Sequence, residues 1–273
     1  MKYVKLTWDY IKEKHFRILA LACVVPAVAL ALLKSFSTTA SYFVNFSRET
    51  SDSFAEIFRL STRFGWQSVL RGVASIVIIA LFSSYLVGVV IRHMRTGRPD
   101  LSHAFTRINE NFLAVIRLVL LTGVLILLFG LLNSTFVFLW SKVARNVIWL
   151  VFLLSFLTMA GLFFILIGAF SYTALWVPAM VVTGQPALPS LATSIRETKD
   201  HGFASFFVGV LLPLIPGFAI EFLTSFVGNP VLTVIGDFVF YFVVLAYYPV
   251  FSAVAYYDVN GLDREDLLRA NRM

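Results

Sequence analysis

Four ionisable side chains lie inside apolar runs of the sequence, where a charge is energetically expensive: Arg71, Arg117, Glu221 and Asp237. Charged groups in such surroundings pair with one another or face a polar ligand, so each is a candidate for function. Arg71, Glu221 and Asp237 are expected at one depth, near the outer ends of their helices. They form either a polar binding site or structural pairs, whereas Arg117 is expected to extend to the inner interface.

A second chemical signal is the segment from Pro213 to Gly217, which interrupts an apolar run over residues 203–227. Proline removes a backbone donor and disrupts a helix. Broken membrane helices expose backbone groups and often mark transport sites. We therefore predict a helix break at Pro213, Pro216 and Gly217, beside the candidate polar site.

Basic residues between the apolar runs provide a possible anion site. Arg92, Arg95 and Arg98 follow one apolar run closely and are candidates for binding an anionic headgroup or phosphate. The alternative is that they serve only to orient the chain in a membrane.

The sequence predicts neither a metal site nor a cofactor. The single cysteine, Cys23, lies inside an apolar run, so no paired-cysteine site is possible. The histidines share one predicted side but match no metal-binding spacing; they are His15, His93, His103 and His201. The sequence also has no P-loop, dinucleotide turn or nucleophile elbow, so we do not expect an enzyme.

The elements that hold these residues are membrane helices. Of 273 residues, 59% are hydrophobic and 14% charged, and several apolar runs reach the length of roughly 18 residues that a spanning helix needs. The net charge of +7 lies mainly between these runs, which is typical of orientation signals and argues against nucleic acid as a partner. The chain is therefore predicted to be an all-α polytopic membrane protein.

Six spans are predicted, at about residues 16–33, 68–91, 112–140, 147–182, 203–227 and from Pro230 to 257. The fourth is too long for one perpendicular crossing and should tilt, bend or project, with Gly161, Gly168 and Pro178 as the places where it bends. Most Lys and Arg residues outside the spans lie at the chain ends and in the second and fourth connections, so both ends should face the cytoplasm.

Thr96-Gly97-Arg98-Pro99 and Thr183-Gly184-Gln185-Pro186 form an internal repeat at an offset of 87 residues. Each precedes an apolar strip at helical spacing, beginning at Leu101 and Leu188, which predicts a helix lying flat on the membrane. Asn260-Gly261 echoes the turn. The single membrane domain, 1–273, is thus predicted to contain three parallel hairpins, 1–95, 96–182 and 183–258, and a cytoplasmic tail, 259–273.

Two further surface helices are expected. Residues 1–15 carry four lysines and an apolar strip at Val4, Thr7, Trp8 and Ile11, so they should lie on an anionic inner surface. A basic start before an apolar run is also typical of a cleaved signal peptide, but the repeat needs this run as a partner for the second span. The second surface helix is expected within residues 34–67.

The predicted spans, the Gly184-x-Pro186-x-Leu188 element and the ending Ala255-Tyr256-Tyr257-Asp258 resemble a broad family of bacterial membrane proteins. That family includes the membrane domain fused to some glycerophosphoryl diester phosphodiesterases. The resemblance implies a bacterial inner-membrane protein with an envelope or lipid role. It implies no catalytic residues, and no phosphodiesterase domain is present in this chain.

Three functions are compatible with these patterns. The leading hypothesis is that the protein binds or moves a lipid or other amphiphile, with membrane lipids as its partners. The alternatives are a scaffold or assembly factor that binds a membrane-protein partner or its own copies, and a secondary transporter of a small solute.

Overall fold

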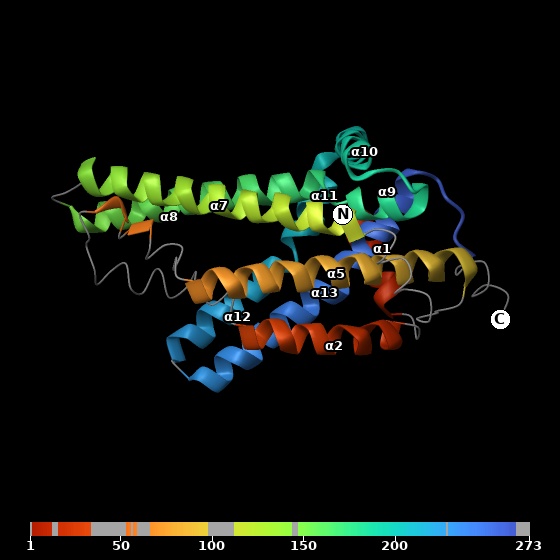
Figure 1. Ribbon diagram of the computed structural model, residues 1–273, viewed down its shortest axis with the longest axis horizontal. Helices are drawn as coiled ribbons and strands as arrows, with labels where there is room; N and C mark the ends of the chain where they lie inside the picture. Colours follow the sequence, from red (N-terminus) through yellow and green to blue (C-terminus); the bar gives the residue numbers. More distant parts are fainter. Residues whose placement is uncertain are drawn as a thin grey trace.

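The computed structural model describes residues 2–12, 16–33, 53–55, 57–58, 66–97, 112–143, 147–227 and 229–265. All regular secondary structure in these ranges is helical, which confirms the all-α part of the predicted fold (Figure 1). The helices are α1 (Lys2–Lys12), α2 (Phe16–Leu33), α5 (Trp66–Thr96), α7 (Phe112–Val143), α8 (Ile148–Tyr172), α9 (Trp176–Thr183), α10 (Ala187–Asp200), α11 (Phe203–Leu211), α12 (Leu214–Val227) and α13 (Pro230–Val259).

Four helices in the described ranges are long and apolar enough to cross a membrane. They are Leu70–Thr96, Gly123–Val143, Trp149–Thr183 and Pro230–Val259. The bent pair formed by α10 and the stretch Phe203–Gly217 makes a fifth if it counts as one broken span. The apolar part of α2, Leu19–Leu33, is shorter. The chain therefore has the helices of an integral membrane protein, and the sixth crossing stays a prediction.

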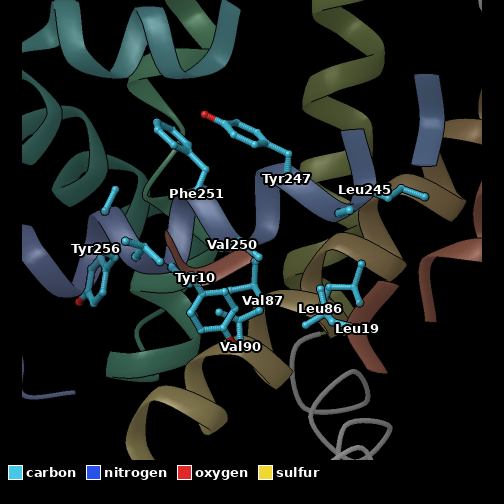
Figure 2. Packing of buried hydrophobic residues seen from close by; sticks show 14 of the residues in the cluster. Tyr10, Leu19, Leu86, Val87, Val90, Leu245, Tyr247, Val250, Phe251 and Tyr256 are labelled. Carbon is cyan, nitrogen blue, oxygen red and sulfur yellow. The ribbon is translucent and has the colours of Figure 1, made fainter. Parts of the chain in front are cut away.

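Helix α13 forms the centre of the core and packs against α1, α2, α5, α9 and α12. Figure 2 shows how its two sides are used: Val250 lies toward Val87 and Val90 of α5, while Tyr247 and Phe251 lie on the opposite side. Asn229 caps the start of the helix by accepting a 2.9 Å hydrogen bond from the backbone N–H of Val231. This cap explains why α13 begins at Pro230, where the sequence predicts the start of the sixth span.

Helices α7 and α8 form an antiparallel pair that extends beyond the neighbouring ends of α5, α12 and α13 (Figure 1). The indole N–H of Trp140 donates a 2.9 Å hydrogen bond to the hydroxyl of Thr158 across the pair. Near the projecting end, buried Ile57 packs against Val137, so the described residues of the 34–67 connection include a helical turn on this hairpin. The long fourth run thus extends past the ends of the neighbouring helices, which is one of the three arrangements predicted for it.

The bend in the fourth run lies at Thr173–Leu175, between α8 and α9. Pro178 follows it and has no N–H to donate to the carbonyl of Ala174, so the predicted role of this proline is confirmed. The expectation that Gly161 and Gly168 would bend the helix is wrong, because α8 continues through both. Glycine alone removes no hydrogen bond from a helix, so α8 stays regular there.

Three helices end in the same way. Gly97, Gly184 and Gly261 follow the ends of α5, α9 and α13 with φ angles of 63°, 68° and 58°. These left-handed angles favour glycine and terminate a helix. The preceding residue donates from its side chain to the carbonyl four residues earlier in each case: Thr96 to Arg92, Thr183 to Ala179 and Asn260 to Tyr256. The predicted echo at Asn260-Gly261 therefore reproduces the local turn geometry.

Helix α10 is the amphipathic helix predicted after the second turn, and it lies at 105° to the stretch Phe203–Gly217. Its apolar strip faces outward, with Leu188 71% and Ile195 42% exposed. Its small polar face is buried against the protein at Ser190, Ser194 and Thr198. An outward apolar strip on a crosswise helix is the arrangement that membrane-surface contact requires. The helix predicted after Gly97 lies outside the described residues.

Candidate functional site

Asp237 is buried in α13, with 3% of its surface exposed. Two glycines bring α12 close to this part of α13. A Cβ on Gly236 would lie 3.1 Å from Ile220, and a Cβ on Gly217 would lie 2.0 Å from the ring of Phe240. The sequence therefore places a buried carboxyl group next to a tight helix contact.

The other two residues of the predicted polar site are not seen beside Asp237. Arg71 has an exposed side chain on α5 and makes no hydrogen bond or ion pair with any residue whose side chain the structure describes. Glu221 lies within α12, which packs against α13, but its side chain is outside the described part. The structure thus brings together the helices of Glu221 and Asp237, and the pairing of their charges stays a prediction.

The fifth run is divided between α11 and α12 at Leu212–Pro213, within the segment where a break is predicted. Pro213 is buried and, lacking an N–H, cannot donate to the carbonyl of Gly209. Tyr248 of α13 donates a 2.6 Å hydrogen bond to the neighbouring carbonyl of Val210. Pro216 is exposed within α12 and does not break it. The broken backbone is therefore held by a side chain from the central helix.

The sequence analysis missed Tyr248. A tyrosine in an apolar run is usually assigned to a lipid interface, and only the fold shows that its hydroxyl reaches a broken helix. The spacing of Gly209, Pro213 and Gly217 was the available signal, because four-residue steps place all three on one face of a helix.

A second polar region joins α1 to the ends of α5 and α13. The hydroxyl of Tyr10 lies 2.8 Å from Nδ1 of His93, and both residues are buried. Lys2 forms a 2.6 Å salt bridge with Asp258, whose hydrogen bond raises the pKa of the lysine. The guanidinium of Arg264 lies 5.8 Å from the centre of the Tyr10 ring. These contacts hold the two terminal segments on the core.

The buried face of α1 differs from the predicted one. Val4 and Thr7, which are predicted to face the membrane surface, are buried in the protein together with Tyr3 and Tyr10, whereas Trp8 is 44% exposed. Tyr3 packs on Phe206 with ring centroids 4.8 Å apart. The signal was the seven-residue spacing of the two tyrosines, which puts them on one face; treating them as polar concealed it.

The predicted headgroup residues lie at the end of α5. Arg92 is half-buried and Arg95 is exposed, while Arg98 lies outside the described residues. Exposed cations near an amphipathic helix can bind anionic headgroups or set orientation, and this geometry serves both. In the ranges that the structure describes, no three His, Cys, Asp or Glu residues gather as metal ligands would.

The side chain of Ser194 attaches α10 to the junction between α8 and α9. Its hydroxyl accepts a 3.2 Å hydrogen bond from the N–H of Leu175 and donates one of 2.8 Å to the carbonyl of Tyr172. These are backbone groups at the bend between α8 and α9. On the same helix, burial raises the pKa of Glu197, and a hydrogen bond from Asn260 opposes that rise.

Comparisons of the chain with protein-family models, with curated proteins and with solved structures found no match. The candidate sites therefore stand on the geometry of this chain alone.

Proposed function

We propose that this is a six-span bacterial inner-membrane protein that binds or moves a lipid or other amphiphile. Its three hairpins enter from the cytoplasmic side, and both chain ends lie there. The common geometry of Gly97, Gly184 and Gly261 supports the threefold layout. The outward apolar strip of α10 supports its place at the membrane surface.

The observation that carries the functional proposal is the burial of Asp237 in α13, next to Gly236, which packs against α12, and one turn from Phe240. Ionisable groups inside membrane helices are expensive and usually belong to a binding or transport path. Pro213, at the break between α11 and α12, has no N–H to donate to the carbonyl of Gly209. A polar headgroup would bind near the carboxyl group, and the surrounding apolar helices would accept acyl chains.

Lipid analysis of the purified protein tests the proposal. Wild type, Asp237→Asn and the exposed control Asp200→Asn are extracted in mild detergent, and bound lipid is quantified by mass spectrometry per mole of folded protein. We expect Asp237→Asn to lose most of the bound lipid while Asp200→Asn matches wild type. Equal lipid content in all three proteins, or wild type without lipid, contradicts the proposal.

A scaffold or assembly role is the second candidate, favoured by the α7–α8 hairpin. The span Trp149–Thr183 has the highest hydropathy of the four and is the least buried within the molecule. Large side chains are exposed toward its projecting end, including Trp149 and Phe152. A stoichiometric membrane-protein partner that crosslinks to Trp149→Cys, together with wild type free of lipid, would favour this function over lipid binding.

A further inference from the structure

The hydroxyl of Tyr247 is buried and has no hydrogen-bond partner among the described residues. Buried hydroxyls of Ser75 and Ser155 also lack partners, but a helical serine can rotate toward its own backbone carbonyl four residues earlier. A tyrosine hydroxyl lies at the far end of a rigid ring and cannot do so. Because buried polar groups are almost always satisfied, the partner of Tyr247 is expected to come from outside the described residues.

The neighbouring Tyr248, unlike Tyr247, has a hydrogen-bond partner within the described part of the protein. Tyr248 donates its hydroxyl proton to the carbonyl of Val210 at 2.6 Å. Two adjacent tyrosines of α13 thus point to different elements, and only one hydroxyl is satisfied within the described protein.

Aromatic rings surround Tyr247. Its ring stacks on Phe251 at a centroid distance of 5.7 Å and an interplanar angle of 13°. Phe251 contacts Phe206 of α11, and the ring centroids of Trp8 in α1 and Tyr247 are 6.3 Å apart. Figure 2 shows Tyr247 and Phe251 together on the side of α13 that faces away from Val87. The hydroxyl therefore lies in an apolar wall built by three helices.

Trp8 is the exposed member of this aromatic wall. It is 44% exposed, whereas Tyr247 is 3% exposed. The exposed Lys5 and Lys12 on the same helix attract anionic lipid. Since the hydroxyl is not accessible to solvent, a ligand must displace some of the side chains around it to reach it.

We infer that Tyr247 donates a hydrogen bond to an ester or phosphate oxygen of a phospholipid bound beside α1. This inference rests on the proposed function and identifies the oxygen-bearing part of the ligand as the group recognised. The aromatic wall of Trp8, Phe206 and Phe251 contacts its apolar part.

The test uses the full chain, stripped of lipid, and titrates it with phosphatidylglycerol by native mass spectrometry. Tyr247→Phe should bind about tenfold more weakly, the effect of one well-placed hydrogen bond. Its thermal stability without lipid should equal or exceed that of wild type, because the hydroxyl has no described protein partner. Tyr248→Phe controls for stability and should unfold at a lower temperature.

A phosphatidylglycerol with ether-linked chains identifies the acceptor. If Tyr247→Phe weakens binding of the ester form alone, the acceptor is an ester carbonyl; if it weakens both forms, the acceptor is a headgroup oxygen. Unchanged binding by Tyr247→Phe overturns this inference and leaves the proposed function standing, whereas wild type that binds neither form overturns both.

Discussion

The contact between Gly217 and Phe240 offers a quantitative test of the packing of α12 against α13, the helix that carries Asp237. A Cβ at position 217 would lie 2.0 Å from Cδ2 and 2.4 Å from Cε2 of the phenylalanine ring. It would also lie 3.2 Å from Cγ, at the base of the ring, so rotation of the ring alone does not remove the overlap. Phe240 is buried in the core, which leaves little room to shift.

The magnitude follows from comparing Gly217→Ala with Gly161→Ala. In a helix, alanine is more favourable than glycine by about 1 kcal/mol, and that gain applies to both variants. At Gly161 a Cβ meets nothing within 4 Å, so the gain is retained. At Gly217 overpacking opposes it by about 1 to 3 kcal/mol. The two variants should therefore differ by about 1 to 3 kcal/mol, with Gly217→Ala the less stable.

Unfolding in mixed detergent micelles, followed by far-ultraviolet circular dichroism during a titration with dodecyl sulfate, measures this difference. The lipid content of Gly217→Ala should fall together with its stability, because the substitution pushes α12 away from α13. A Gly217→Ala protein at least as stable as Gly161→Ala would refute the close contact between α12 and α13.

Three further substitutions test other parts of the structure. Ser194→Ala should cost about 1 to 3 kcal/mol, because two buried backbone groups lose a partner; the exposed Thr193→Ala, whose hydroxyl bonds only within its own helix, should cost much less in the same titration. Burial raises the pKa of Glu197 above its ordinary value of 4.5. The folded state therefore disfavours the charged carboxylate, and the protein loses stability as the pH rises from 4.5 through the raised pKa. Glu197→Gln should therefore stabilise the protein at pH 7, with a benefit that vanishes in a thermal-melting series below about pH 4. Tyr10→Phe removes the hydrogen bond to His93 and should speed amide hydrogen exchange along α1, measured by mass spectrometry; unchanged exchange would show that the bond does not hold the helix.

Much of the helix layout follows from local physics. The apolar runs predict α2, α7 and α13 closely, because each is bounded by polar or turn-forming residues. The breaks near Pro178 and Pro213 are equally local, since a missing N–H acts within one turn.

The parts of the candidate site that the sequence did not reveal depend on contacts across the fold. The burial of Asp237 depends on which helices pack against α13, and hydropathy alone does not predict this packing. The exposure of Arg71 depends on where α5 faces lipid. The different roles of Tyr247 and Tyr248 depend on which element each ring reaches, and hydropathy treats the two residues alike.

The six-crossing layout underlies every proposal above, and cysteine accessibility tests it most directly. With the native thiol removed by Cys23→Ala, single cysteines are placed in intact cells by the substitutions Ser41→Cys, Val147→Cys, Asn229→Cys, Gln185→Cys and Asp263→Cys. A membrane-impermeant maleimide should label the first three from outside and the last two only after the membrane is opened. Labelling of Gln185→Cys or Asp263→Cys in intact cells, or protection of Ser41→Cys, would contradict the three-hairpin layout.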